Sequence, residues 1–329
     1  MLLVGNTPVQ TSPYIKYLGL TLDENWTFGT HFQSVVPKAV KAAISLGHLM
    51  PNIGGPVWKA RKLYATAVRS IILYGAPVWA DELQHNRLAL AEIRRFERRL
   101  AVRVARLYRT TATDAACILA GLPPLHLEAV SLARRYNFKK RIENQHRVLT
   151  NEISVQLRKE ENQKILADWK KELYKLTNIS SGHRVIMALR DLLPEWQAEL
   201  EEHGTLDYRT AQIITGHGVF GDFLHRIGKE GSAKCWECGA SKDGADHTLY
   251  ECSAFTTQRD LLIQLIGPHV NLHSIMSAIL TDPSVKSTFC TFCQEVISIK
   301  EKNETERRRE ILTRRTRRRR RPPAHLRRD

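Results

Sequence analysis

The chain has 329 residues, 43% of them hydrophobic, and carries a formal net charge of +16 with a pI of about 9.8. This composition can bury a core and excludes wholesale disorder, while the charge favours a polyanionic partner, either nucleic acid or an anionic membrane surface. The N-terminal segment lacks the basic start of a signal peptide, and no apolar stretch reaches the ~20 residues that cross a bilayer, so we expect no membrane partner.

The predicted fold is mainly α, with a short β-hairpin before the first helix. Residues 1–26 alternate apolar and polar side chains around turn signals such as "GNTP", which is typical of strands. Gly75 and Pro77 are expected to end the second predicted helix. Apolar residues recur at every third or fourth position, the spacing of amphipathic helices, across about 28–50, 56–74, 84–110 and 124–145.

The C-terminal half is also expected to be helical. Residues 146–202 are highly charged, with Trp169 and Trp196 as packing anchors. A short apolar helix follows and is interrupted by "GHG" at 216–218, and two further helices are expected within 257–300. The "C-x2-C" formed by Cys290 and Cys293 fits buried helix positions better than a second metal site.

The final segment, 301–329, is dominated by arginine. It holds twelve Arg and one Lys against five acidic residues, so it supplies +8, half of the net charge. We expect a disordered basic tail, because such a low-complexity sequence offers no core. Its uncompensated arginines are candidate contacts to RNA or DNA phosphates, and the same run is typical of a nuclear-import signal. The residues concerned are Arg314, Arg315, Arg317 and Arg318.

The segment "CWECGASKDGADHTLYEC" predicts a small zinc site with the spacing C-x2-C-x8-H-x4-C. The expected ligands are Cys235, Cys238, His247 and Cys252, four N and S donors of the kind that Zn²⁺ binds in a tetrahedron. All four positions would be filled by protein, so we expect one structural zinc ion that supplies folding energy and leaves no place for a reactive water. Asp243 and Asp246 are either partners of the ligand histidine or exposed loop acids.

Aromatic and basic residues around the predicted zinc site suggest a role in binding single strands. Zinc knuckles bind unstacked bases on exposed aromatic side chains, which fits Trp236 and Tyr250, and Lys234 is near enough to meet phosphates. Packing of Trp236 over the metal ligands is an equally good interpretation.

The helix predicted over 84–110 carries a basic stripe opposite its apolar face. Arg95, Arg99, Arg103 and Arg106 could line a channel beside a nucleic-acid duplex, with contacts to phosphates that carry no sequence information. The alternative is a solvated helix face partly paired with Glu92 and Glu97.

Several stretches in a fixed order resemble one family. "KYLGLTLDENWTFGTHF" is similar to the primer-grip-like end of the palm in non-LTR (LINE-type) reverse transcriptases, and "LYATAVRSIILYGAPVWAD" is similar to their thumb helix. "ILAGLPPLHLEA", "LDYRTAQIITGHGVFGDFL" and the Cys/His segment resemble, in that order, the C-terminal region of the insect type-1 rDNA-targeted clade. The likeness runs from about residue 14 to 260.

This resemblance implies a domain order. Tyr17, Leu18 and Gly19 would be the primer-grip-like turn. The implied segments are 1–26 as the end of the palm, 27–145 as the thumb, 146–230 as a helical linker, 231–256 as the CCHC zinc knuckle, 257–300 as C-terminal helices and 301–329 as the Arg-rich tail.

The resemblance also implies what the chain does. The parent polyprotein would be an RNA-directed DNA polymerase, but the family's palm carboxylates lie upstream of the turn at Tyr17, where no Asp or Glu precedes it here. We therefore expect a fragment that grips RNA or DNA, that cannot polymerise alone, and that works with upstream palm and endonuclease domains in the nucleus after a cytoplasmic ribonucleoprotein stage. The alternatives are a stand-alone RNA-binding zinc-knuckle protein kept by a host, and a decayed remnant.

Overall fold

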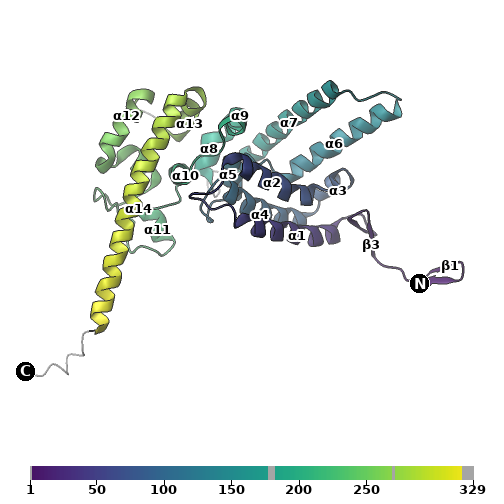
Figure 1. The fold of residues 1–329 in the computed structure, drawn as a ribbon, viewed down its shortest axis with the longest axis horizontal. Helices are drawn as coiled ribbons and strands as arrows, with labels where there is room; N and C mark the ends of the chain where they lie inside the picture. The colour runs from purple at the N-terminus through teal and green to yellow at the C-terminus, as the bar shows by residue number, and fades with distance from the viewer. Residues whose placement is uncertain (1, 177–181, 269–270, 321–329) are drawn as a thin grey trace, which may run out of the picture. The chain divides into compact units, whose positions relative to one another are not determined.

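The computed structural model describes residues 2–176, 182–268 and 271–320 (Figure 1). The chain divides into two compact units, which are described separately: unit 1 covers Met1–Leu206 and unit 2 covers Asp207–Asp329. Both units are mostly helical, which confirms the predicted fold class.

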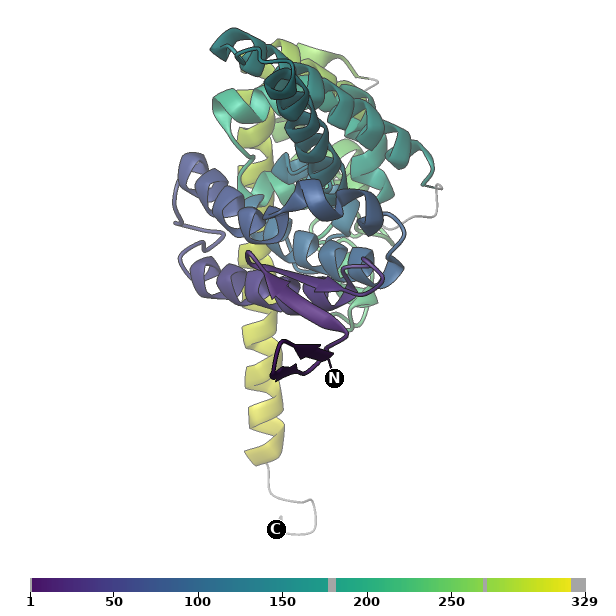
Figure 2. The same cartoon turned by 90° about the vertical axis from the view of Figure 1, so that its right-hand side faces the viewer.

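Unit 1 begins with two antiparallel hairpins where one was expected. The first pairs β1 (Leu2–Val4) with β2 (Thr7–Val9), and the second pairs β3 (Tyr14–Tyr17) with β4 (Leu20–Asp23). Strand β3 is exposed along its length, whereas Leu20 of β4 is buried, and β4 contacts the first helix. Figure 2 shows this second hairpin beside the first helices of the chain.

The helices predicted over 28–50, 56–74, 84–110 and 124–145 are present in unit 1, and the structure adds α3 and α5 between them. The loop 145–150 joins two long helices, α6 and α7, which contact each other as a helical hairpin (Figure 1). The elements are α1 (Gly29–Gly47), α2 (Trp58–Leu73), α3 (Ala76–Leu83), α4 (Arg87–Val104), α5 (Thr113–Ala120), α6 (Leu125–Asn144), α7 (Asn151–Tyr174), α8 (His183–Leu189), the 3-10 turn η1 (Arg190–Leu192) and α9 (Leu193–His203).

Helix α2 ends at Leu73, just before Gly75, as predicted, but a further helix, α3, follows directly. Gly75 adopts φ +71°, which a residue with a side chain rarely adopts. Helix α3 begins at Ala76, and Pro77 lies in its first turn, where its missing N–H costs nothing. Trp79 of α3 is buried, packs edge-on against Phe32 with ring centroids 5.1 Å apart, and donates its Nε1–H to the Tyr74 carbonyl at 3.0 Å. The motif "YGAPVW" is therefore a sharp corner between two helices.

The core of unit 1 contains large side chains from several of its helices. Phe32, Phe96 and Trp79 are buried among α1 to α4. Trp169 and Trp196, the two predicted anchors, are each 1% exposed, and Trp196 Nε1 donates to the Ile118 carbonyl at 2.8 Å. This bond satisfies the buried indole N–H and ties α9 to α5.

Three helices begin at or after Thr256 in the described part of unit 2, where two were expected within 257–300. Short helices precede the Cys/His segment and long ones follow it. The elements are α10 (Tyr208–Thr215), α11 (Gly221–Arg226), the π-helical turn η2 (His247–Glu251), the 3-10 turn η3 (Ser253–Phe255), α12 (Thr256–Ile266), α13 (Leu272–Thr281) and α14 (Pro283–Arg320).

Helix α14 is the main packing element of unit 2. Its N-terminal half buries a stripe at helical spacing that contains Phe289, Cys293, Val296 and Lys300. Cys293 is buried and Cys290 half-buried, as the helix interpretation of this second C-x2-C expects. The helix also continues through Arg320, so the prediction of a disordered tail from residue 301 is wrong for 301–320 (Figure 2).

Among the described residues, no single helix has both the length and the apolar composition to cross a membrane. Helices α5 and α6, bent by 55° at the break between them, meet those limits only as a pair. Residues 115–120 of α5 are buried inside unit 1.

Candidate metal centre and basic groove

The four predicted ligands converge in unit 2. One donor atom each from Cys235, Cys238, His247 and Cys252 lie within 4.8 Å of one another. Cys235 Sγ is 3.8 Å from Cys252 Sγ, and Cys238 Sγ is 3.2 Å from His247 Nε2. This cluster of three sulfurs and one imidazole can hold a metal ion.

Local backbone geometry explains how so short a segment brings the donors together. Gly239, at φ +83°, allows the chain to fold back after the second cysteine, so that its N–H donates to the Cys235 carbonyl at 2.9 Å. The Cys235 N–H in turn donates to the Ala240 carbonyl at 2.8 Å. On the other side, the π-helical turn closes with the Cys252 N–H donating to the His247 carbonyl at 2.7 Å.

The thiols differ in their readiness to ionise. Burial acts to raise the pKa of Cys238, but hydrogen bonds from the Ala240 backbone, Cys235 and His247 lower it to about 7. Burial raises the pKa of both Cys235 and Cys252. A bound cation would favour all three thiolates, so metal binding is coupled to proton release.

A buried lysine from α14 lies beneath the ligand loop. Lys300 Nζ lies 3.0 Å from Glu237 Oε2 and 3.0 Å from both carboxylate oxygens of Asp243, and these three side chains are at most 5% exposed. Burial alone would lower the pKa of Lys300, but Asp243 and Glu237 raise it, so the ammonium stays charged. Glu237 sits between the first two ligands, so this ion cluster fixes the loop to α14.

Asp243 is therefore neither an exposed loop acid nor the partner of the ligand histidine. Besides Lys300, its carboxylate accepts the Gly221 N–H at 2.8 Å and the Thr248 hydroxyl at 3.2 Å. The carboxylate that faces His247 belongs to Glu251, with Oε2 3.4 Å from Nδ1, which leaves Nε2 directed at the cluster.

Arg259 of α12 completes the support for the cluster. Its buried guanidinium donates from Nε to the Leu249 carbonyl at 2.8 Å, and from Nη2 to the carbonyls of Thr248 at 3.2 Å and Cys252 at 2.7 Å. One side chain thus satisfies carbonyls at the end of η2 that would otherwise be orphaned. No sequence motif identified Arg259 or Lys300 as a supporting residue. The position of Lys300 on the apolar stripe of α14 was the available signal, because a lysine there is expected to form a buried ion pair.

The aromatic residues near the cluster differ in accessibility. Trp236 is 42% exposed, with Lys234 Nζ 3.8 Å and Arg307 Cζ 5.1 Å from the centroid of its ring, whereas Tyr250 is half-buried in η2. Lys234, predicted as a phosphate contact, thus lies over the indole. The arrangement is a cation–π group on the surface of unit 2.

Only two of the four arginines predicted as a basic stripe on α4 line the same groove. Arg99 and Arg103 line a groove of about 710 Å³ between α1 and α4, whereas Arg95 is exposed elsewhere on the helix and Arg106 follows the helix end at φ +57°. The lining residues that the structure describes include no acidic side chain. They add three basic residues that sequence reasoning missed, His48, Arg98 and Arg109.

The proposed pairing of the stripe with Glu97 is wrong. Glu97 is buried on the other side of α4, where its carboxylate accepts the Leu125 N–H and faces Arg69. Burial raises the pKa of Glu97. The arginines of the groove therefore lack this acid as a counter-charge.

A second sign of uncompensated charge is Arg61, which is fully buried beside the groove. Its guanidinium donates to three carbonyls, those of Pro56 at 3.1 Å, Arg103 at 2.6 Å and Pro51. Burial, then the charges of Arg106 and Arg103, lower the pKa of Arg61 to about 10. Because the partners of Arg61 among the described residues are neutral carbonyls, its positive charge acts on the surroundings.

The primer-grip-like turn packs against the helix corner described above. Leu18 and Gly19 both have positive φ between β3 and β4, and the Tyr74 hydroxyl donates to the Leu18 carbonyl at 2.9 Å. Tyr17 and Leu18 point their side chains to solvent, at 61% and 73% exposed. Two motifs 56 residues apart thus form one surface.

The remaining predicted contacts lie at the C-terminal end. The backbone of Arg314, Arg315, Arg317 and Arg318 belongs to α14, but their side chains lie outside the described residues, as does the segment 321–329.

His217 in "GHG" stacks on Phe223 with ring centroids 4.9 Å apart, a packing contact.

Comparisons with known proteins identify the class. No protein-family model matches the chain, and no solved structure matches it significantly. The Retrovirus-related Pol polyprotein from type-1 retrotransposable element R1 4 of Nasonia vitripennis is 26% identical over 266 residues, which is 79% of this chain. A second Nasonia polyprotein, from element R1 2, is 26% identical over 89% of this chain, and a 115 kDa protein in element R1DM of Drosophila melanogaster is 26% identical over 86%.

The chain is therefore homologous to retrotransposon Pol polyproteins. Within that class its relatives come from type-1 elements, which confirms the predicted resemblance to LINE-type retrotransposon proteins. The chain spans 65%, 28% and 71% of the lengths of these first Nasonia, Drosophila and second Nasonia relatives.

Proposed function

We propose that this chain is a nucleic-acid-gripping part of a type-1 retrotransposon polyprotein, with one structural zinc ion and no polymerase activity of its own. The partners would be the RNA or DNA strands of retrotransposition, together with palm and endonuclease domains of a parent RNA-directed DNA polymerase. Its place of action would be the nucleus, after a cytoplasmic ribonucleoprotein stage. The relatives support the polyprotein context.

The donor geometry supports zinc as the ion. A tetrahedral zinc with Zn–S bonds of about 2.3 Å has sulfur–sulfur edges of about 3.8 Å and sulfur–nitrogen edges of about 3.6 Å. The Cys235–Cys252 edge is 3.8 Å and the Cys238–His247 edge 3.2 Å, a few tenths of an ångström short. Cys235, Cys238, His247 and Cys252 would hold the ion, which would lock the loop rather than supply chemistry.

The observation that carries nucleic-acid binding is the groove between α1 and α4. It presents four arginines and one histidine without an acid among its described lining residues. Arginine forks match phosphate geometry and stay charged at all relevant pH values. Such a groove would bind a phosphate backbone without reading sequence.

Salt-dependent binding of the full chain to labelled single-stranded RNA and DNA tests this proposal. The variant Arg99→Gln/Arg103→Gln removes two arginine–phosphate pairs, so the slope of log K against log salt should flatten by about 1.4–1.8. The matched control is Arg87→Gln/Lys59→Gln, which removes the same charge from exposed positions of unit 1 outside the groove.

Equal slopes for the two double variants would show that the groove is not the interface. Failure of the native chain to bind either polynucleotide at low salt would overturn the function itself. In contrast, a flattened slope in the groove variant alone would support it.

A further inference from the structure

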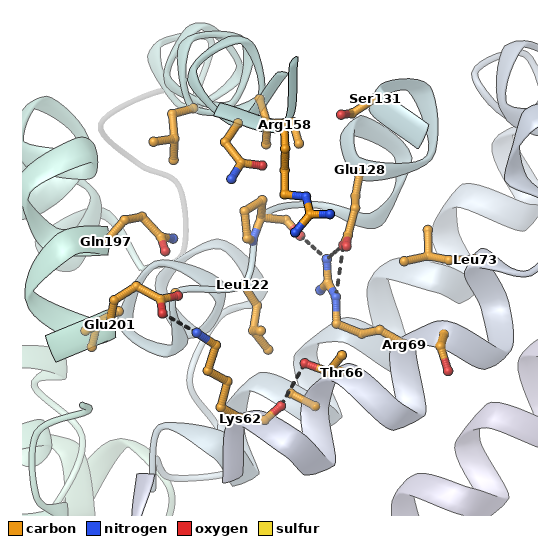
Figure 3. Close-up of a pocket in the computed structure, with 18 of the residues that line it drawn as sticks. Lys62, Thr66, Arg69, Leu73, Leu122, Glu128, Ser131, Arg158, Gln197 and Glu201 are labelled. Carbon is orange, nitrogen blue, oxygen red and sulfur yellow. Dashed lines mark hydrogen bonds and ion pairs between the residues drawn. The ribbon is translucent and has the colours of Figure 1, made fainter. Parts of the chain in front are cut away.

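A second cavity in unit 1 is built differently from the groove. It has a volume of about 950 Å³ and lies where α2, α6, α7 and α9 meet beside the 121–123 loop. This volume is in the range of sites that enclose small ligands. Figure 3 shows side chains converging on it from several sides, with Lys62 and Arg69 below, Arg158 above and Gln197 and Glu201 to the left.

Both acidic residues that line the cavity are already paired. Glu201 forms an ion pair with Lys62, and Glu128 forms one with Arg69. The Arg69 guanidinium also donates from Nη2 to the Pro123 carbonyl at 2.6 Å. Each of these two ion pairs is neutral, so neither Glu128 nor Glu201 is available to neutralise the other basic residues of the lining.

Two guanidiniums of the lining remain uncompensated. Arg135 of α6 and Arg158 of α7 have no hydrogen bond or ion pair within the described part of the chain, although neighbouring Arg134 is paired with Glu161 at 2.7 Å. Arg158 reaches from α7 toward the Arg69–Glu128 pair (Figure 3). The cavity therefore carries a surplus of two positive charges, which favours an anionic ligand.

A buried donor in the cavity wall is also unsatisfied. The side chain of Arg69 is 95% buried, and its Nη1 has no hydrogen-bond partner among the residues that the structure describes. A buried donor without a partner is costly, so it points to a ligand oxygen or a small rearrangement toward one.

The other walls match a nucleobase better than a bare anion. Asn162 lies one turn from Arg158 on α7, and Gln197 of α9 lies across the cavity, so two amides are available to hydrogen-bond a base edge. Leu122 and Leu166 add apolar surface for its faces. Amides, apolar walls and free guanidiniums together suit a base joined to a phosphate.

We propose that this cavity binds one nucleotide, free or as part of a single strand, with Arg135 and Arg158 holding its phosphate. The site is separate from the groove of α1 and α4, since the two share no lining residue. The inference rests on the proposed function in one respect, that the anion comes from nucleic acid.

Isothermal titration calorimetry of the full chain tests the site with three probes: inorganic phosphate, uridine monophosphate and a short oligouridylate. Arg135→Gln/Arg158→Gln should weaken nucleotide binding about a hundredfold, since each charge-assisted hydrogen bond contributes about tenfold. Neither side chain forms a hydrogen bond or ion pair with another described residue, so the variant should fold like the native chain, as circular dichroism would check. Arg135→Lys/Arg158→Lys should retain part of the affinity because it keeps the charge but loses the planar fork.

The probes distinguish the two sources of the nucleotide. Saturable binding of uridine monophosphate that disappears in the Gln variant supports a free-nucleotide site, and the same effect with the oligouridylate alone supports a strand. Inorganic phosphate bound as tightly as either would contradict a role for the base.

Failure of this site is separable from failure of the proposed function. If the native chain and Arg135→Gln/Arg158→Gln bind both nucleotide probes equally, or if the native chain binds neither, the cavity site is wrong. If Arg99→Gln/Arg103→Gln leaves polynucleotide binding unchanged while the cavity variant no longer binds uridine monophosphate, the groove is wrong and the cavity site stands.

Discussion

Lys300→Met removes the ammonium that faces Glu237 and Asp243 and keeps a side chain of similar size. In the native protein Lys300 Nζ lies 3.0 Å from Glu237 Oε2 and from both Asp243 oxygens, in surroundings almost closed to solvent. The variant leaves the Asp243 carboxylate buried without its cation, and it leaves Glu237 with only the longer ion pair to Arg307, whose Nη1 lies 4.0 Å from Glu237 Oε1. Removing one partner of a buried ion pair costs about 3–5 kcal/mol.

We expect this penalty to reach the metal site, because Glu237 lies between two ligands. If the whole penalty acts on the metal-bound state, zinc affinity falls by about two to three and a half orders of magnitude. Competition of the full chain with a chromogenic zinc chelator measures this change. Lys302→Met is the matched control, since Lys302 is exposed on the same helix and should stay within about 0.5 kcal/mol of the native chain.

A rescue variant separates charge from packing. Lys300→Met combined with Glu237→Gln and Asp243→Asn removes the three buried charges of this ion cluster, and such replacement is often neutral or stabilising. Zinc affinity should therefore recover relative to the single variant. If Lys300→Met and Lys302→Met compete with the chelator equally well, the ion cluster does not support the metal loop.

Three further predictions concern other parts of the chain. Gly75→Ala should lower the free energy of unfolding of unit 1 by about 1–3 kcal/mol, because Gly75 has φ +71° and an added Cβ would lie 2.6 Å from Leu20 Cδ2. Calorimetric unfolding checks this, and a transition temperature equal to that of the native chain would refute it. Truncation after Thr313 should flatten the salt dependence of RNA binding by about 0.7–0.9 for each arginine–phosphate pair that it removes, whereas a constant slope would exclude the terminal arginines from the interface. Primer extension by the chain on a primed RNA template should yield no product, and template-dependent synthesis would contradict that expectation.

The helices and the metal ligands could be predicted because their signals are local. Apolar residues at helical spacing anticipated α1, α2, α4 and α6, and four donors at fixed spacing anticipated the cluster. Helix α3 was missed because Gly75 and Pro77 were interpreted only as the end of α2, whereas they also form the start of α3. The helical continuation of α14 was missed because composition alone was taken to imply disorder.

The supporting residues could not be predicted because they depend on contacts between distant segments. Lys300 meets Glu237 and Asp243 across 63 and 57 residues of chain. Similarly, the sequence shows Arg99 and Arg103 on one stripe, but only the packing of α1 on α4 turns them into a groove and separates them from Arg95. Glu97 was misassigned although its position, four residues after Ile93 and three before Leu100, places it on the apolar face of α4.

Metal analysis of the purified full chain tests the central claim most directly. Plasma mass spectrometry should find about one zinc per native chain, the same amount in Cys290→Ser, and none in Cys238→Ser. Cys290 is a fair control because it lies on α14, away from the cluster. Zinc that persists in Cys238→Ser, or native protein that is folded and free of zinc, would contradict a metal-locked loop.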